Sequence, residues 1–574
     1  MGTTNIGGKE IDKNEYDVVV VGLGPTGLTF GHFLGKAGIK VLILEKEAQF
    51  YGNARAVYTD DECMRIFQQV GIAEDLHEDM LIDTPVTFTK KDGTPLFEMM
   101  DSTRPLSWPR SNFLYQPYLE TKMADQLDQY DNVTVVRSKE VVDFAQDEQG
   151  VTVSFVETTG DGYGTEEGTK KESQETFHVR AKYLVGCDGG RSVTRSTLNI
   201  GMQGKTYKEP WIVVDIKAKD GEEENEIFSH LPYFMFICDP DCPTVSCPQP
   251  DGYHRFEFML KEGDTKEYME KESTVRSLIG EYVDPDKITI MRKLVYNFNA
   301  LVADKWQDGR VFLAGDAAHM TPQFIGQGMN AGVRDAYNLS WKLIAVLNQG
   351  ASPTVLESYQ SERFQHVKKM IALAVELKAM VSMTNPLGTK LRDLFMKGAN
   401  NFSDKLKIQL LDEKVRASAQ LENKKYLGMA RTSRNGPEGD LMPQPIVRDP
   451  QGKLVKLDEV LGDGFSVIGV SVNPKEELDT ELVNLLENMG AQFVTVYGRY
   501  GRPQGTEPRK KSFAAQGVAE VDDHEEELVS WLRKSGSKKP VAIVRPDRFI
   551  FSIIDKPSSV KSSKKILNEY FSAA

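Results

Sequence analysis

The stretch "DVVVVGLGPTG", residues 17–27, decides the fold of the first part of this 574-residue chain. The run from Asp17 to Val21 is almost entirely apolar, which is typical of a parallel strand buried on both faces. A GxGxxG pattern follows directly, and a helix rich in small residues is expected as far as Gly38. The next strand, Val41 to Leu44, ends at Glu45. This order predicts a dinucleotide-binding α/β unit of the Rossmann type.

Each glycine of the turn has its own task in such a unit. Gly22 permits the tight bend, Gly24 lets the backbone approach a pyrophosphate, and Gly27 lets the helix pack on the strand. A carboxylate at Glu45 would accept hydrogen bonds from the ribose hydroxyls of an adenosine. The motif predicts dinucleotide binding without separating FAD from NAD, and the alternative is a glycine turn that only packs a helix.

Two later motifs favour FAD, because a plain nicotinamide dehydrogenase needs neither of them. The first, "CDGGRSVTR", follows a predicted strand from Tyr183 to Cys187, and the second, "AGDAAHMTP", follows a strand from Val311 to Ala314. Asp316 in the second motif is suited to bind a ribityl hydroxyl. The cofactor candidates from these two motifs are Asp188, Gly189, Gly315, Asp316 and Pro322.

A further helix is expected to open at "GQGMN", residues 326–330. Its first amide groups have no partner within the helix, and a reduced flavin carries negative charge on its N1–C2=O edge. Helix-start amides stabilise such a charge through the helix dipole and through hydrogen bonds. The candidates here are Gly326, Gly328, Met329 and Asn330.

Composition and charge exclude several classes. A net charge of −14 argues against a nucleic-acid partner, and no apolar run approaches the ~20 residues that span a membrane. The polar first residues lack the core of a signal peptide. Five scattered cysteines favour free thiols and a cytoplasmic protein. A zinc site in "CDPDCPTVSC" is disfavoured because no CxxC pair is present, so we predict no metal.

We expect FAD-binding parts at about 15–80, 110–205 and 295–400, interleaved with a mixed-sheet substrate domain at about 81–109 and 206–294. A helical segment and linker should cover 401–439, and a small α/β domain 440–574. The polar insert "ETTGDGYGTEEGTKKESQET", residues 157–176, is interpreted as an exposed hairpin loop.

GxGxxG, DGxxSxxR and GD with a following proline, in this order, resemble the group A flavoprotein aromatic hydroxylases of the para-hydroxybenzoate hydroxylase type. The chain is most similar to the 3-(3-hydroxyphenyl)propionate hydroxylase branch, through "ARAVYTDDECMRIFQQVG", "CDGG", "WIVVDI", "RFEFM", "VRDAYNLSWKL" and "VRPDRF". The likeness spans nearly the whole chain and implies a thioredoxin-like C-terminal domain. That domain has no cysteine, which excludes a thiol redox role and leaves packing or the contacts of a homodimer.

The resemblance implies FAD contacts at Arg55 in "NARAVY" and Gln116 in "YQPYLE". Further cofactor-binding candidates are Pro25 and Thr26 in the glycine turn and Lys46 directly after Glu45. It links Asp188 to both FAD and the nicotinamide. Pro322 would lie near the flavin C4a edge, where its carbonyl can accept a hydrogen bond from substrate or peroxide.

The resemblance also implies a reaction. NADPH or NADH, bound transiently, reduces the flavin, and O2 then forms a C4a-hydroperoxide that hydroxylates a small phenol ortho or para to its OH. The substrate is expected to resemble 3-(3-hydroxyphenyl)propionate or to be another substituted phenol. The alternatives are an aromatic polyketide hydroxylase and a non-catalytic flavin-binding protein. A flavin halogenase is disfavoured because no W-x-W is present.

Among the predicted site residues, the side chains that would assist the reaction of the phenol are the ones that the sequence determines least. Arg255 and Glu257 alternate along one strand and share a face, so Arg255 lies either at the site or in an ion pair with Glu257 on a solvated face. His254 is a pH-sensitive neighbour or an ordinary surface histidine. His319 is expected to hydrogen-bond backbone rather than to act as a base. Two buried-type aromatics, Trp108 and Tyr115, are expected to belong to the core rather than to the pocket.

Overall fold

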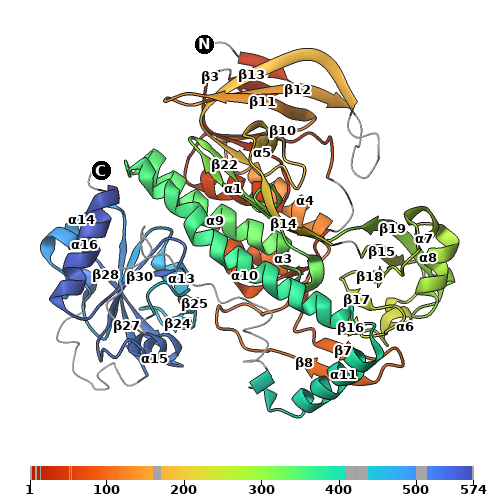
Figure 1. The fold of residues 1–574 in the computed structure, drawn as a ribbon. Helices are drawn as coiled ribbons and strands as arrows, with labels where there is room; N and C mark the ends of the chain where they lie inside the picture. Colours follow the sequence, from red (N-terminus) through yellow and green to blue (C-terminus); the bar gives the residue numbers. More distant parts are fainter. Residues whose placement is uncertain are drawn as a thin grey trace. The chain divides into compact units, whose positions relative to one another are not determined.

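The computed structural model describes residues 3–6, 9–12, 14–50, 52, 55–159, 170–207, 209–404, 406–407, 421, 437–499 and 513–571. The chain divides into two compact units. Unit 1 comprises residues 1–103, 109–336 and 367–417, and unit 2 comprises residues 104–108, 337–366 and 418–574. Both sets of elements are labelled in Figure 1.

Unit 1 is built first on an eight-stranded sheet in the order β10-β4-β3-β13-β12-β11, with β22 beside β13 and β21 beside β22. The strands next to β3 are parallel to it, whereas β11, β12 and the first part of β13 form antiparallel pairs. The bounds are β3 Asn14–Val21, β4 Val41–Leu44, β10 Val133–Val136, β11 Lys139–Gln146, β12 Val151–Thr159, β13 Lys170–Gly186, β21 Gln307–Asp308 and β22 Val311–Leu313.

The helix after the glycine turn, α1 (Pro25–Lys36), packs on β3 and on α4 (Gln116–Leu127). The predicted strand, turn, helix and strand are therefore confirmed. The predicted loop at 157–176 is partly wrong, because β12 continues to Thr159 and β13 begins at Lys170. Its middle, residues 160–169, lies outside the described residues.

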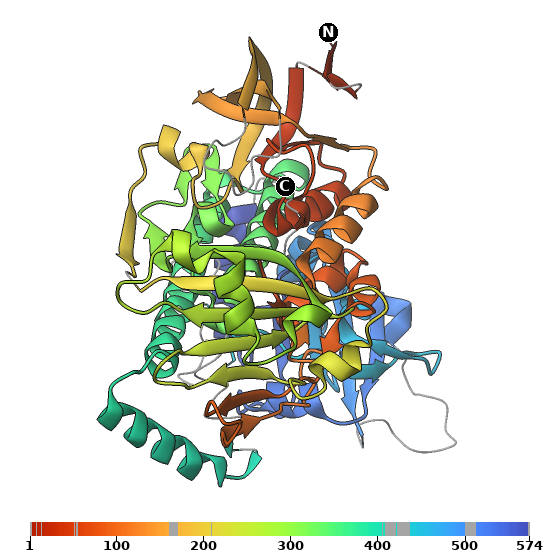
Figure 2. The same cartoon turned by 90° about the vertical axis from the view of Figure 1, so that its right-hand side faces the viewer.

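A second sheet of unit 1 has seven strands in the order β19-β15-β18-β17-β16-β7-β8. All neighbours are antiparallel except β16 and β7. The bounds are β7 Val86–Thr89, β8 Pro95–Met99, β15 Trp211–Ala218, β16 Phe234–Ile237, β17 Thr244–Pro248, β18 Tyr253–Met259 and β19 Ile288–Tyr296. Three short helices, α6 (Glu224–Phe228), α7 (Lys266–Met269) and α8 (Glu272–Ile279), lie over this sheet (Figure 2). The sheet is therefore covered on that face by apolar packing.

Smaller strands and helices complete unit 1. Two three-stranded sheets have the orders β5-β9-β6 and β14-β20-β23. The bounds are β5 Tyr58–Thr59, β6 Leu81–Ile82, β9 Asn112–Phe113, β14 Met202–Thr206, β20 Asn299–Ala303, β23 His319–Met320, α2 Asp61–Gln69, α3 Ala73–His77, α5 Val193–Thr197 and α11 Pro386–Asn400. The long helices α9 (Gln327–Asn348) and α10 (Ser358–Val381) each contribute residues to both units. No helix among the described residues is long and apolar enough to cross a membrane.

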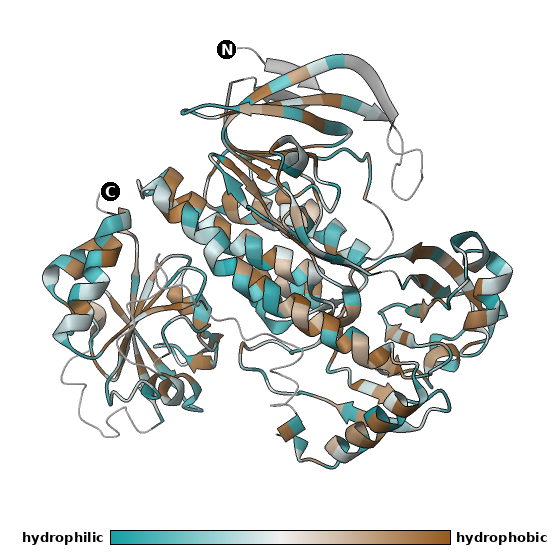
Figure 3. Cartoon of the chain, in the orientation of Figure 1, coloured by the Kyte–Doolittle hydropathy of each residue, from teal (hydrophilic) through white to brown (hydrophobic). Residues whose placement is uncertain are grey.

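Unit 2 contains a seven-stranded sheet in the order β25-β24-β28-β27-β26-β29-β30, in which β26, β27 and β28 are parallel. The bounds are β24 Ile446–Arg448, β25 Leu454–Lys456, β26 Ser466–Val470, β27 Gln492–Gly498, β28 Val518–Asp523, β29 Val541–Val544 and β30 Ile550–Ile554, with helices α13 Leu457–Leu461, α14 Thr480–Asn488, α15 Glu527–Arg533 and α16 Pro557–Phe571. Its strands are largely hydrophobic and its helices carry hydrophilic residues (Figure 3). The α/β character predicted for this part is confirmed.

Candidate functional site

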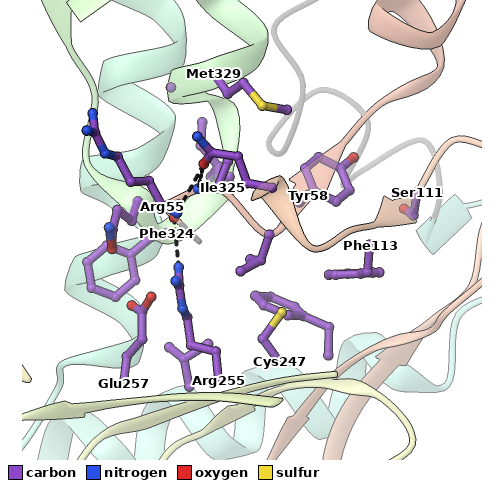
Figure 4. Close-up of a pocket in the computed structure, with 18 of the residues that line it drawn as sticks. Arg55, Tyr58, Ser111, Phe113, Cys247, Arg255, Glu257, Phe324, Ile325 and Met329 are labelled. Atoms are coloured by element: carbon purple, nitrogen blue, oxygen red, sulfur yellow. Dashed lines mark hydrogen bonds between the residues drawn. The ribbon is translucent and has the colours of Figure 1, made fainter. Parts of the chain in front are cut away.

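A cavity of about 470 Å³ lies within unit 1, between the glycine turn, the start of α9 and the seven-stranded sheet. Figure 4 shows Arg255 and Glu257 rising side by side from the sheet into this space, below Arg55 and Phe324. The predicted site residues that line the cavity are Gly24, Pro25, Thr26, Arg55, Gln116, Gly189, Arg255, Asp316, Gly326, Gly328 and Met329. Residues distant in sequence therefore meet around one space.

The three glycines of the turn meet different surroundings. A side chain at Gly22 would lie 2.5 Å from the carbonyl oxygen of Cys187, and one at Gly27 would lie 2.0 Å from that of Gly22. A Cβ at Gly24 would meet nothing within 4 Å. The protein's own packing therefore requires two of the glycines. Gly24 leaves bare backbone facing open space, as a bound pyrophosphate requires.

Glu45 acts on the turn itself. Its Oε2 accepts a hydrogen bond from the backbone N–H of Leu23 at 2.7 Å, and its Oε1 accepts one from that of Glu47 at 2.9 Å. The side chain is buried, whereas Lys46 beside it is exposed and lies 3.7 Å from the Glu47 carboxylate. Neither Glu45 nor Lys46 lines the cavity, so Glu45 fixes the shape of the turn from behind.

Gln116 and Arg255 together hold the segment that carries Arg55. The Gln116 side-chain oxygen accepts from the backbone N–H groups of Arg55, at 3.0 Å, and Ala56, at 2.5 Å. Arg255 donates through Nη1 to the Arg55 carbonyl at 2.7 Å (Figure 4). The amide of Gln116 is in turn held by Glu120 at 2.7 Å. The segment that carries Arg55 is thus anchored from both sides of the cavity.

Asp188 does not line the cavity. Its carboxylate accepts from the Ser192 hydroxyl at 2.5 Å and from the backbone N–H of Thr194 at 2.9 Å, which fixes the start of α5. Its neighbour Gly189, with φ of +74°, faces the cavity instead. The aspartate therefore shapes the loop that presents Gly189.

The "AGDAAHMTP" segment divides between the cavity and the core. Asp316 reaches the cavity and is open to it, yet the surrounding protein raises its pKa by desolvation. Gly315 donates its N–H to Asp335 at 3.1 Å, and His319 Nε2 lies 2.6 Å from the same carboxylate. His319 is therefore held by a side chain rather than by backbone. Pro322 is buried between two residues that do line the cavity.

The start of α9 is confirmed at Gln327, after Gly326 with φ of +62°. Gln327 donates to Asp60 at 3.1 Å, and Asn330 accepts from the Thr59 hydroxyl at 3.0 Å. Their side chains hold the helix to the protein, while Gly328 and Met329 line the cavity. A Cβ at Gly328 would meet nothing within 4 Å, so this first turn also leaves free space.

The far side of the cavity is apolar, with a few buried polar groups. Rings and thioethers come from Phe88, Phe97, Met99, Phe113, Phe234, Phe236 and Phe324. Arg255 and Glu257 lie on the cavity face of β18, as the alternation along the strand predicts. Both side chains are buried, so the alternative prediction of an Arg255–Glu257 ion pair on a solvated face is wrong. Arg255 instead pairs with Asp215, with Nε 2.6 Å from Oδ1. No pattern in the sequence indicates this partner on β15, because the two residues are 40 positions apart.

His254 is neither a surface histidine nor a neighbour of the site. It is 1% exposed, stacks on Phe228 with ring centroids 5.1 Å apart, and lies 2.8 Å from the Ser246 hydroxyl. Burial lowers the pKa of His254 to about 3. The prediction is wrong because both faces of β18 are covered. His254 precedes Arg255 on this strand, so its side chain lies on the other face, within a second core.

The two aromatics expected in the core are there. Tyr115 stacks on Tyr253 with ring centroids 3.9 Å apart. Trp108 is buried, and the ammonium group of Lys456 lies over its ring, 4.4 Å from the ring centroid. Neither lines the cavity, and Trp108 belongs to unit 2 rather than to the substrate sheet.

The open glycine turn of residues 22–27 (the glycine cradle) lies beside a helix start and an apolar chamber, an arrangement suited to a dinucleotide cofactor and an apolar ligand. Residues 15–374 match the FAD binding domain family, and residues 439–569 match the HcaD C-terminal domain family. The chain belongs to the FAD-dependent aromatic hydroxylase family.

Within that family, the chain is 34% identical over 539 residues to a 3-(3-hydroxy-phenyl)propionate/3-hydroxycinnamic acid hydroxylase of Klebsiella pneumoniae, covering 93% of this chain and 91% of the relative. It is 32% identical to the enzyme of that name from Burkholderia cenocepacia, covering 95% of each. The fold is similar to that of aklavinone-11 hydroxylase in complex with FAD and aklavinone, with a TM-score of 0.74, 21% identity and coverage of 97% and 99%. It is also similar to p-nitrophenol 4-monooxygenase from Pseudomonas putida, with a TM-score of 0.61, 24% identity and coverage of 70% and 99%.

Proposed function

We propose that this protein is a FAD-dependent monooxygenase that hydroxylates a phenolic compound ortho or para to its OH, with NADPH or NADH and O2 as co-substrates. The observation that carries the proposal is the cavity, where an open glycine cradle and an aromatic chamber share one space. The relatives at 32–34% identity support the same reaction class. NADH and NADPH stay undecided.

The residues around the cradle fit FAD. Gly24, Pro25 and Thr26 would border the pyrophosphate, and Asp316 would hold the ribityl chain. The first turn of α9, at Gly328 and Met329, would present its amides to the reduced ring. The chemistry that FAD would supply when bound is hydride uptake from the nicotinamide and activation of O2. The protein's part is to orient the phenol beside it and to exclude water.

We place a 3-(3-hydroxyphenyl)propionate-like phenol first among the substrates. Phenylalanine rings at residues 88, 113, 234 and 236 would pack on an aromatic ring. Arg292 and Arg110 also reach the cavity, but Arg292 shares Asp215 with Arg255 and Arg110 pairs with Asp101 at 2.8 Å, so a substrate carboxylate would add to ion pairs that already exist. The polyketide hydroxylases are similar in fold only, at 19–22% identity, so a polyketide stays the second candidate.

The decisive experiment is a screen of phenols against the FAD-loaded protein, with NADPH and NADH offered separately. Substrate-stimulated oxidation of the nicotinamide, O2 uptake and a hydroxylated product are expected. Released peroxide must be measured as well, because a poor substrate mimic can trigger reduction without being hydroxylated. A yellow protein that shows neither stimulated oxidation nor product would instead be a non-catalytic flavin-binding protein.

Asp316→Ala tests the cofactor assignment separately from turnover. Removal of the carboxylate should leave a folded, largely colourless protein, because a ribityl hydroxyl loses its partner. The ratio of flavin absorbance to protein absorbance after gel filtration measures this. Full retention of FAD by the variant would refute the assignment.

For the C-terminal part we propose a thioredoxin-like domain without redox chemistry. The parallel strands β26, β27 and β28, with antiparallel β29 and β30 beside them, support this assignment. The chain has no cysteine after Cys247, so a disulfide exchange role is excluded. Packing or homodimer contacts are its proposed role, and light scattering of the purified protein would test the homodimer.

A further inference from the structure

Three polar side chains meet at one end of the otherwise apolar part of the cavity. The Tyr296 hydroxyl lies 3.4 Å from Glu257 Oε2 and also hydrogen-bonds the side-chain oxygen of Gln323. All three residues line the cavity. Gln323 directly follows Pro322, the residue expected beside the reacting edge of the flavin. A hydroxyl group of a bound ring would find both a donor and acceptors here.

The register of the sheet sets the charge around this group. Asp215 on β15 is paired with Arg255 on one neighbouring strand and with Arg292 on the other. Its carboxylate lies 2.6 Å from Arg255 Nε and 3.6 Å from Arg292 Nη1. Two guanidinium groups thus share one carboxylate, and the three residues carry a net charge of +1. One additional negative charge nearby would be balanced.

Glu257 is the carboxyl group placed to supply that charge. On β18 it lies one residue pair further along the same face, opposite Val213. Burial raises the pKa of Glu257, and the charge of Arg255 opposes this rise. Besides Asp215, Arg255 and Arg292, the titratable groups around Glu257 are Tyr296 and the Cys247 thiol on β17, and burial raises the pKa of both.

We propose that Glu257 accepts the proton of the substrate's phenolic hydroxyl, and that Tyr296 and Gln323 hold this hydroxyl in place. This inference rests on the proposed function and identifies the substrate class as phenols that bind in the neutral form. The O–H bond breaks, its proton moves to a Glu257 oxygen, and the electron pair stays on the phenolic oxygen. The total charge of acid and phenol stays at −1, which the Asp215, Arg255 and Arg292 cluster balances.

The transfer raises electron density at the ring carbons ortho and para to the phenolic oxygen. One of these carbons forms the new C–O bond with one oxygen atom derived from O2 as the O–O bond breaks. The second oxygen atom leaves as water, and NAD(P)H supplies the two electrons. The ring then loses the hydrogen of that carbon as a proton and regains its aromatic character. Glu257 returns its own proton to the phenolic oxygen, so that the product leaves as a neutral diphenol.

The test compares Glu257→Gln with Glu98→Gln, which makes the same chemical change at an exposed position of the same sheet. The probe is 3-(3-hydroxyphenyl)propionate, or the phenol that best stimulates NAD(P)H oxidation by the FAD-loaded wild type. Its dissociation constant is measured against pH from the flavin absorbance of the oxidised protein. Product and peroxide formed per nicotinamide are measured over the same pH range.

The wild-type and Glu98→Gln proteins should lose hydroxylation on the acid side, as Glu257 takes up a proton at a pH above the ordinary glutamate range. Glu257→Gln should lose this acid limb and form product at least about 100-fold more slowly, as expected for loss of a general base. Its dissociation constant should change less than about tenfold, because an amide still hydrogen-bonds the phenol. Peroxide should replace most of the missing product.

Glu257→Asp should regain the acid limb and part of the rate, which a merely structural role would not explain. Unchanged product formation and an unchanged pH profile in Glu257→Gln would overturn the inference. If Glu257→Gln does not fold, the wild-type profile still decides, since the absence of an acid limb contradicts the proposal. A wild-type protein without phenol-stimulated NAD(P)H oxidation would instead contradict the proposed function.

Discussion

Two of the buried charge clusters in the described part of the chain use their charges differently. In unit 2, Arg545 donates to both oxygens of Glu362 at 2.8 Å and to Asp547 at 2.6 Å, and Lys342 lies 2.8 Å from Glu362. The two positive and two negative side chains of this closed cluster neutralise one another. In unit 1, two arginines share Asp215, and the balance depends on whether Glu257 is ionised.

This difference separates a structural cluster from a functional one. In the closed cluster the remaining lone pairs also have partners, since Trp341 donates to Asp547 at 3.0 Å and Asn338 donates to Glu362 at 2.8 Å. The cluster that contains Glu257 borders a cavity, and we propose that it exchanges a proton with a ligand there. Burial of a charged group alone therefore does not indicate a functional site, whereas a buried charged group beside a cavity does.

The largest effect is expected from Glu362→Gln, which opens the closed cluster. Arg545 and Lys342 would keep buried charges with too few partners, so unfolding should become easier by about 3–5 kcal/mol. The matched control is Glu209→Gln at the half-exposed pair with Lys378, where about 1 kcal/mol or less is expected. Denaturant unfolding of both variants measures the difference, and equal midpoints would show that the closed cluster contributes little.

The next effect concerns the glycine turn. Gly24→Val should weaken FAD binding at least about 100-fold, or about 2.7 kcal/mol, while the apo-protein keeps its thermal midpoint, because the new side chain meets only open space. Gly27→Ala should lower both the FAD affinity and the thermal midpoint, since its Cβ would clash with the Gly22 carbonyl. Flavin titration and thermal unfolding test the pair. Normal FAD affinity in Gly24→Val would refute the cradle.

An effect of similar size, but confined to acid pH, is expected from His254, on the closed face of β18. Its pKa of about 3 in the folded protein lies below the unfolded value of 6.5, so its contribution to stability is present above pH 6.5 and is lost as the pH falls toward 3. The loss amounts to about 1.4 kcal/mol per pH unit within this window. His254→Leu should flatten the decline of stability between pH 6.5 and 4.5. A slope identical to that of the wild type would contradict the burial of a neutral imidazole.

The smallest effect is expected from Gly328→Ala in the first turn of α9. Alanine should stabilise the helix by less than about 1 kcal/mol, since its methyl group has open space around it. The same methyl group narrows the cavity and should weaken FAD binding a few-fold, or about 1 kcal/mol. Thermal unfolding of the apo-protein and flavin titration measure the two effects. Stronger FAD binding would show that this turn does not border the cofactor.

Much of the fold could be predicted because its signals are local. The strand of residues 17–21, the glycine turn and the helix start at Gln327 each follow from neighbouring residues. The insert was misread in part because polar, charged residues also form long paired strands, as Lys170 to Thr176 do. Alternation on β18 correctly placed Arg255 and Glu257 on one face, but could not tell which face meets solvent.

The dinucleotide turn and the order of the FAD motifs follow from the amino-acid sequence alone, since backbone conformation and helix starts depend on residues close along the chain. The partners of the charged groups become known only from the folded chain. Asp215 and Arg255 are 40 residues apart, and Glu257 and Tyr296 are 39 apart, so their meeting depends on strand order and register. Those long-range pairings set the local charge and burial, on which proton transfer depends.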